Sequence, residues 1–282
     1  MSIRKATLYD LGDLIKIYAT APDIETIPDE LEIRKKRKAK GFERDGWLCF
    51  DENGKVVGEI NTRIDMSPRF GKVGVITNIV VDYEYRSKGI GKSLMAAAEE
   101  RFVEKGASRI FINAPVSIYN FFMKLGYFRY DQVIKVRSSL ENLKSLRPRN
   151  FEMNELDLRK RLRPSTRLLN LGVPGQISEG ITNMMSGMSK GKFFEFRKAG
   201  MFIGIGAIWN VDESTVQIAV DVDKHGLKYL PAIIVKTSKA AKDYGVSNIE
   251  SYVSSRAMQY FYNAGKWTEE NTDILILTKI IK

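Results

Sequence analysis

Two residue types on which many enzymes depend are almost absent from this sequence. Its 282 residues include one cysteine, Cys49, and one histidine, His225. A single cysteine excludes a disulfide framework within the chain and any zinc or iron–sulfur site built on several thiolates. A single histidine argues against histidine-based metal sites and against Ser-His-Asp catalysis. We therefore expect no metal site.

Long apolar runs are also absent. No stretch approaches the ~18 consecutive apolar residues of a membrane span, and the first residues, MSIRKATLYD, lack the apolar segment of a secretory signal. We therefore expect a cytoplasmic protein without a membrane partner. With 44% hydrophobic residues the chain can bury a core, and 282 residues suffice for two domains. The net charge of +11 permits an anionic partner, which could be a nucleic acid, a phosphorylated cofactor or a membrane surface, without choosing among them.

The chain contains an internal repeat, in which the same order of predicted strands and helices occurs twice. Val81-Asp82 recurs as Val220-Asp221, an offset of 139 residues (220 minus 81). Each copy predicts three strands, a helix, a strand, a short helix and a last strand. The predicted fold class is therefore α/β (α+β), with two tandem domains, 1–145 and 146–282. The boundary falls in the polar segment Glu141–Asn150.

A loop with two glycines follows the third strand of the first copy. The run Arg86-Ser87-Lys88-Gly89-Ile90-Gly91-Lys92-Ser93 joins the apolar strand Gly74–Asp82 to a predicted helix, Lys92–Lys105. Glycines allow an anion close to the backbone, and the first N–H groups of a helix lack an intrahelical acceptor. The loop therefore suits a pyrophosphate, although a plain strand-to-helix turn would use the same glycines. A P-loop and a Rossmann fingerprint are excluded, because Arg86 and Leu94 stand where those motifs need glycine.

With Val81-Asp82-Tyr83-Glu84-Tyr85 before it, this loop resembles the acetyl-CoA loop [Q/R]-x-x-G-x-[G/A] of the GNAT superfamily of N-acetyltransferases. The order of elements is similar to that family's, and so is the aromatic helix that ends in Leu125-Gly126-Tyr127. The resemblance covers about residues 3–137 and, more faintly, 193–281. It implies two GNAT-like domains, each a mixed, mostly antiparallel twisted sheet flanked by helices, with acetyl-CoA as the cofactor.

The resemblance also implies which residues hold acetyl-CoA. The pyrophosphate would lie on the loop and the pantetheine arm along the preceding strand, where one amide would hold the thioester oxygen. The implied contacts are Ile79, Val80, Val81, Arg86, Ser87, Lys88, Gly89, Ile90, Gly91, Lys92 and Ser93. In the second copy Lys228 and Leu230 replace the two glycines of the loop. We therefore expect a degenerate second domain that does not bind the cofactor in this way.

The catalytic residues are harder to assign. The resemblance implies direct acetyl transfer to a primary amine in a ternary complex, and such enzymes often donate a proton from a tyrosine four residues before the last helix's glycine. Phe122 stands there instead. Tyr119 or Tyr127 could replace that tyrosine, although either could also be a packing aromatic. Glu59, on the neighbouring strand, is the candidate base, directly or through water; an exposed structural carboxylate is the alternative.

Because Phe122 stands where a proton-donating tyrosine is expected, a second class of protein stays an alternative. It is a non-catalytic GNAT-like protein that senses CoA or associates with nucleic acid. The basic runs Arg34–Lys40 (RKKRKAK) and Arg159–Arg167 could contact an acidic acceptor or a nucleic acid. We do not favour nucleic acid, because the first run has no interleaved aromatics and fits a solvated helix. The acceptor amine (small molecule or protein), the role of the C-terminal domain and the oligomeric state stay open.

Overall fold

The computed structural model describes residues 2–20, 48–67, 70–146, 150–157 and 173–281. Both basic runs, including the helix expected at the first, lie outside these residues. In the described part of the chain, no helix combines the length and the apolar character that crossing a bilayer requires.

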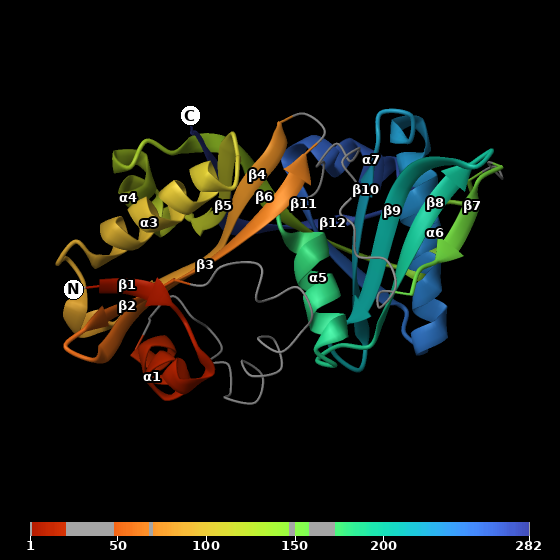
Figure 1. Ribbon diagram of the computed structural model, residues 1–282. Helices are drawn as coiled ribbons and strands as arrows, with labels where there is room; N and C mark the ends of the chain where they lie inside the picture. The colour runs from red at the N-terminus through yellow and green to blue at the C-terminus, as the bar shows by residue number, and fades with distance from the viewer. Residues whose placement is uncertain (1, 21–47, 68–69, 147–149, 158–172, 282) are drawn as a thin grey trace.

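Within the described residues the strands form one 12-stranded sheet, in the order β1-β2-β3-β4-β5-β12-β6-β11-β10-β9-β8-β7 (Figure 1). The strands are β1 Ser2–Lys5, β2 Leu48–Glu52, β3 Lys55–Ser67, β4 Gly71–Val81, β5 Arg109–Pro115, β6 Phe128–Ser139, β7 Glu152–Glu155, β8 Gly191–Lys198, β9 Met201–Asn210, β10 Thr215–Val222, β11 Asn248–Ser254 and β12 Thr268–Ile280. The helices are α1 Leu11–Thr20, α3 Ile90–Glu104, α4 Tyr119–Lys124, α5 Gln176–Met185, α6 Leu230–Lys239 and α7 Met258–Ala264. The predicted α/β class is confirmed.

The last strand of each repeat lies in the half of the sheet that the other repeat builds. β12 pairs antiparallel with β5, β6 pairs antiparallel with β11, and the two exchanged strands pair with each other. At their contact Gln132 Nε2 donates a hydrogen bond to Asn271 Oδ1 at 2.8 Å, and these residues are separated by 139 positions, the offset of the repeat. The halves are therefore related by a pseudo-twofold axis and share strands. The boundary between residues 145 and 146 stays a prediction.

Helices cover both faces of the N-terminal half of the sheet. On one face α3 buries an apolar stripe that includes Leu94, Ala98 and Phe102. A Cβ placed on Gly74 of β4 would lie 2.6 Å from the Phe102 ring, so only glycine allows this close packing. On the other face α1 packs Leu14, Ile17 and Tyr18, with Val56 and Val80, into a separate buried cluster.

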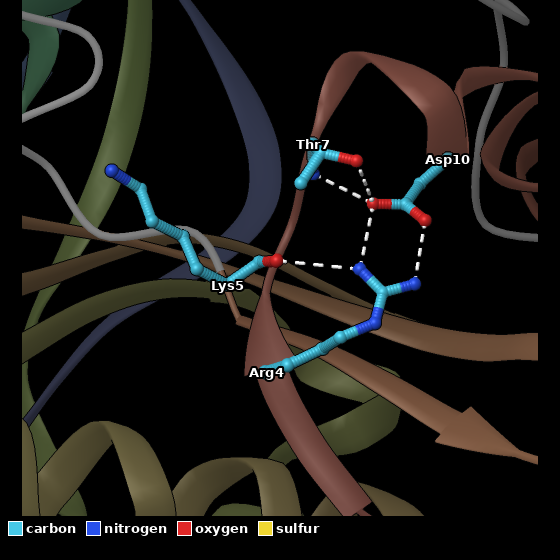
Figure 2. Close-up of polar contacts among 4 residues, drawn as sticks. All are labelled: Arg4, Lys5, Thr7 and Asp10. Carbon is cyan, nitrogen blue, oxygen red and sulfur yellow. Dashed lines mark hydrogen bonds and ion pairs between the residues drawn. The ribbon is translucent and has the colours of Figure 1, made fainter.

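Asp10 ties β1 to the start of α1 (Figure 2). Its carboxylate accepts hydrogen bonds from the Arg4 guanidinium at 2.7 and 2.9 Å and from the Thr7 amide at 2.6 Å. The bond from the Thr7 amide caps a short 3₁₀ turn, Leu8–Asp10, which leads into α1. The hydrogen bonds from Arg4 outweigh the effect of burial and lower the pKa of Asp10 to about 2.

Asp10→Asn should remove an acid-dependent part of the stability. A carboxyl with a depressed folded-state pKa stabilises the fold above its ordinary value of 3.8, and this stabilisation is lost as the pH falls toward about 2. We expect Asp10 to account for on the order of 2 kcal/mol of the unfolding free energy that the wild type loses over this interval, measured by chemical denaturation at several pH values. Asp13→Asn, which removes a solvent-exposed ion pair with Lys16, is the control. The same pH dependence in Asp10→Asn as in the wild type would contradict the assignment.

Leu277→Ala should destabilise the N-terminal half although Leu277 belongs to β12. Its side chain is fully buried in a cluster with Leu94, Phe102 and Ile112. We expect a loss of about 2–5 kcal/mol in the free energy of unfolding, measured in urea, because a large cavity replaces the side chain. Ile280→Ala on the same strand is the matched control, since Ile280 is 58% exposed and should lose less than about 0.5 kcal/mol. Similar losses in the two variants would show that β12 does not complete this core.

Candidate functional site

β4 and β5 are parallel neighbours that separate part of the way along the sheet. Their pairing runs from Val73 opposite Arg109 to Ile76 opposite Ile112 and ends there. At the same level the β3–β4 ladder shifts register and leaves Thr77 as an extra residue on β4. Beyond this point β4 continues beside β3, whereas β5 continues beside β12. The facing edges of β4 and β5 therefore border an opening between the two strands.

The direction of the backbone amides shows which residues of β4 face this opening. The Asp82 amide donates to the Val57 carbonyl of β3 at 2.9 Å. Because backbone groups alternate in direction along a strand, the Val80 amide faces β3 as well, and the backbones of Ile79 and Val81 face the opening. Arg86 Nε donates to the Val81 carbonyl at 3.2 Å, away from the β3 ladder. Of the three implied backbone contacts, Ile79 and Val81 are thus the ones exposed to a ligand there.

The loop after β4 presents backbone amides at the start of α3. Ser87, with φ of +63°, and Gly89, with φ of +83°, turn the chain into the helix. The Ser93 amide donates to the Gly89 carbonyl at 3.0 Å and so makes the first hydrogen bond of the helix. The amides that precede it in this turn have no intrahelical acceptor. They are the groups that an anion at this helix N-terminus would meet.

Charge and space at the loop also fit a pyrophosphate. A Cβ on Gly89 would meet no atom within 4 Å, so the backbone is open here, whereas a Cβ on Gly91 would lie 3.3 Å from the Phe121 ring of α4. Lys88 and Lys92 are exposed, and Ile90 is buried and anchors the turn. Lys88 Nζ lies 4.6 Å from the centre of the Tyr85 ring. The predicted loop residues therefore form one open, positively charged turn.

The equivalent loop of the second copy is closed by its own carboxylate. Asp223 is buried and accepts hydrogen bonds from the amides of His225 at 2.8 Å and Gly226 at 2.7 Å. A Cβ on Gly226 would lie 1.8 Å from the Ile203 carbonyl oxygen, so this loop packs directly on β9. Pro231 occupies the first turn of α6. This geometry agrees with the expectation that the second copy does not hold the cofactor.

Glu59 lies behind the opening, on the sheet face that α1 covers. Its side chain is 0% exposed, so the alternative of an exposed strand carboxylate is wrong. Tyr18 of α1 donates a hydrogen bond from its hydroxyl to Glu59 Oε2 at 2.5 Å and accepts one from Asn78 Nδ2 at 3.0 Å. Glu59 stands opposite Val80 in the β3–β4 ladder, next to Ile79. A carboxylate, a hydroxyl and an amide are thus brought together beside the opening.

The two candidate tyrosines lie in different surroundings. Tyr119 begins α4 and is half-buried. Tyr127 is buried, with its ring centre 5.8 Å from that of Phe122 and 5.5 Å from Lys279 Nζ. Burial, followed by the nearby Glu99 carboxylate, raises the pKa of Tyr127. A phenol with a raised pKa is a weaker proton donor, so the structure favours Tyr119 over Tyr127 for that role.

Four polar residues around the opening go unnoticed in the sequence. Asn61, Asn78 and Asn113 interrupt otherwise largely apolar strands, in GEINTRI, GVITNIVV and RIFINAP, and this interruption is the one signal that could have revealed them. Tyr18 has no such signal, because it occupies a core-facing position of an amphipathic helix. Its role depends on the hydroxyl, which only the folded chain places beside Glu59.

These features define an α/β protein with an open, cationic loop at a helix N-terminus beside two separated parallel strands. Residues 11–127 match the model of the acetyltransferase (GNAT) family. This N-terminal segment, less than half of the chain, is therefore similar to the GNAT family.

One curated relative is the glucosamine 6-phosphate N-acetyltransferase of Trypanosoma brucei brucei. It is 28% identical over 93 residues, which are 32% of this chain and 62% of the relative. The chain therefore matches less than two thirds of that protein's length.

Solved structures resemble the whole chain. A tandem GNAT protein from the clavulanic acid biosynthesis pathway aligns with 99% of this chain and 98% of its own, at a TM-score of 0.57 and 11% identity. A GCN5-related glucosamine N-acetyltransferase region of a fungal multi-domain β-N-acetylglucosaminidase aligns with 98% of this chain and 38% of its own, at a TM-score of 0.63 and 17% identity. A GCN5-related N-acetyltransferase from Kribbella flavida aligns with 99% of this chain and 70% of its own, at a TM-score of 0.62 and 15% identity. At these identities the similarity shows the fold, a tandem GNAT arrangement.

Gly89→Ala should weaken the binding of coenzyme A. A Cβ at this left-handed position strains the backbone by roughly 1–2 kcal/mol and also lies in the space where a phosphate would approach. Gly54→Ala is the matched control, because Gly54 has φ of +79° and equally open surroundings, but lies in the β2–β3 hairpin. We expect similar losses of stability in both variants and a lower coenzyme A affinity, measured by calorimetry, in Gly89→Ala alone. Equal affinities in the two variants would count against the cradle.

Proposed function

We propose that the protein is an N-acetyltransferase that moves an acetyl group from acetyl-CoA to a primary amine by direct attack in a ternary complex. The observation that carries this proposal is the open, cationic glycine loop beside the β4–β5 opening, in a segment that matches the GNAT family. The closed loop of the second copy supports assigning the cofactor to the N-terminal half.

The proposed cofactor contacts follow from the loop and from β4. The amides at the start of α3, with Arg86, Lys88 and Lys92, would hold the pyrophosphate. When bound, acetyl-CoA supplies an activated acetyl thioester. The Ile79 amide, which faces the opening, would donate a hydrogen bond to the thioester oxygen as negative charge develops on it. The Val80 amide faces β3, so Val80 would not bond to the cofactor through this group; it would hold Ile79 and Val81 in place as part of the same strand.

Two proton transfers complete the proposed reaction. Glu59, directly or through one water, would take a proton from the attacking amine as the new C–N bond forms. Tyr18 would hold the Glu59 carboxylate in place through its 2.5 Å hydrogen bond. Tyr119 would return a proton to the sulfur as the C–S bond breaks. Tyr127 is the second candidate for this step, disfavoured by its burial and raised pKa.

The proposed acceptor is an amine, and the similar proteins suggest which amines to test first. Two of the similar proteins are named for acetylating glucosamine or its 6-phosphate. D-glucosamine and D-glucosamine 6-phosphate are therefore the first acceptors of a panel that should also hold polyamines and peptide amines.

Phe122 favours one alternative function, a CoA-sensing protein without turnover. Its fully buried ring occupies the place of the usual proton donor. Release of free CoA thiol with any amine of the panel, followed with a thiol reagent, would exclude this alternative. Tight coenzyme A binding without thiol release across the panel would support it.

Glu59→Gln should lower kcat by roughly a hundredfold and remove the acid limb of the pH–rate profile, because the amide accepts no proton. Coenzyme A affinity should stay at the wild-type value, since Glu59 lies on the sheet face opposite α3. Glu100→Gln, which changes an exposed carboxylate on α3, is the control and should leave both quantities unchanged. An unchanged pH–rate profile in Glu59→Gln would remove Glu59 from the mechanism.

A further inference from the structure

We propose that both halves of the chain build the acceptor subsite, and that its buried amides recognise the hydroxyl groups of an amino-sugar-type amine. This inference rests on the proposed acetyltransferase function and names the class of its acceptor. It starts from the segment Val173–Gln176, which leads into α5.

This segment lies against the N-terminal half at the level where β4 and β5 separate. Arg63 Nη1 of β3 donates to the Gly175 carbonyl at 3.5 Å, and Asn113 Nδ2 of β5 donates to the Pro174 carbonyl at 3.0 Å. A Cβ on Gly175 would lie 3.3 Å from Val75 of β4. From here α5 continues onto β9, where Ile177 and Ile181 pack beside Trp209 (Figure 1). The C-terminal half therefore forms one wall beside the opening.

Three buried amide atoms around this wall have no hydrogen-bond partner among the described residues. They are Asn61 Oδ1, Asn113 Oδ1 and Gln176 Nε2. Asn61 and Gln176 are each only 8% exposed. Leaving such an atom unpaired is energetically unfavourable, so buried polar atoms are normally satisfied by protein, water or ligand. Three unpaired atoms in one region indicate a polar ligand there.

Chain position and two hydrogen bonds place the residues that carry these amides around one segment, Val173–Gln176. Asn61 lies two residues before Arg63 and on the same face of β3, since side chains alternate along a strand. Asn113 directly follows Ile112, the last residue of β5 that pairs with β4. Gln176 directly follows Gly175. The contacts of Arg63 and Asn113 with Gly175 and Pro174 thus connect all three positions.

The chemistry of the unpaired atoms identifies the ligand class. Two are carbonyl oxygens that accept hydrogen bonds, and one is an NH₂ group that donates. The bond to Pro174 requires Asn113 to direct its NH₂ group toward that carbonyl, which leaves the amide oxygen as the unpaired atom. A hydroxyl group both donates and accepts, so neighbouring hydroxyls on one ligand can satisfy all three amides. A hydrocarbon amine would leave them unpaired.

The subsite also lies at a suitable distance from the proposed base. Asn61 follows Glu59 by two residues on the same face of β3, which separates them by about 7 Å along the strand. An amine at Glu59 could therefore carry its hydroxyls on the same six-membered ring to the amides. Asn78, opposite Asn61 in the ladder, lies between these two groups and the opening.

The test compares two six-membered-ring amines, D-glucosamine and cyclohexylamine, on the full-length protein. Gln176→Met removes the amide that the C-terminal half supplies, and Asn61→Leu removes one from β3. We expect each to lower kcat/KM for D-glucosamine about tenfold relative to wild type, with cyclohexylamine and coenzyme A affinity unchanged. Asn183→Leu, near the other end of α5, removes an equally unpaired buried amide oxygen and is the matched control. Unchanged coenzyme A affinity also shows that a variant is folded, and if Asn61→Leu does not fold, Gln176→Met decides.

Equal losses for both amines, or no loss in Gln176→Met, would overturn the inference. If coenzyme A binds but no amine is acetylated, the proposed function fails, and calorimetric titration of D-glucosamine into the CoA-saturated protein decides about the subsite. Weaker binding in Gln176→Met than in Asn183→Leu would support it. No binding to the wild type would overturn it.

Discussion

The exchange of the last strands between the two halves is the constraint on which the rest of the structure depends. Backbone groups of a buried strand need hydrogen-bond partners, and beyond Ile112, where β4 no longer pairs with β5, β12 still pairs with the other edge of β5. β6 does the same for β11. Side chains reinforce these pairings, since the largely buried ion pair between Lys135 and Glu250 joins β6 to β11 at 2.8 Å, and the pair between Lys279 and Glu99 joins β12 to α3 at 2.7 Å.

The opening that carries the proposed chemistry follows from this exchange. β4 can leave β5 after Ile76 because β3 pairs with β4 on one side and β12 pairs with β5 on the other. The extra residue Thr77 sits at the point of separation, as expected of a bulge that redirects a strand. The C-terminal half thus contributes to the N-terminal site in two ways. β12 pairs with the edge of β5 that faces away from β4, and Val173–Gln176 contacts β5 through the hydrogen bond from Asn113 to Pro174.

The two copies share the same fold but differ at the loop that follows the third strand. In the first, Gly89 leaves the amides of the turn open, whereas in the second Asp223 already accepts from the corresponding loop. The buried carboxylate occupies the amides of His225 and Gly226, which agrees with the expectation that this loop does not bind an external anion. We therefore interpret the second copy as the structural partner of the first, and its contribution to acceptor recognition is the proposal made above.

The sequence by itself determined the class of the fold, the repeat and the cationic glycine turn, because these depend on local features: periodicity, glycines at a turn and cations beside them. That this turn binds an anion stays a prediction. The sequence also indicated Glu59 and Tyr119, whose catalytic roles stay predictions. Only the tertiary structure decided that the halves exchange strands, that Glu59 is buried and accepts a hydrogen bond from Tyr18, and that Val173–Gln176 lies against β3 and β5. Strand pairing across more than a hundred residues depends on which edge is free in the folded chain, and no local pattern encodes that choice.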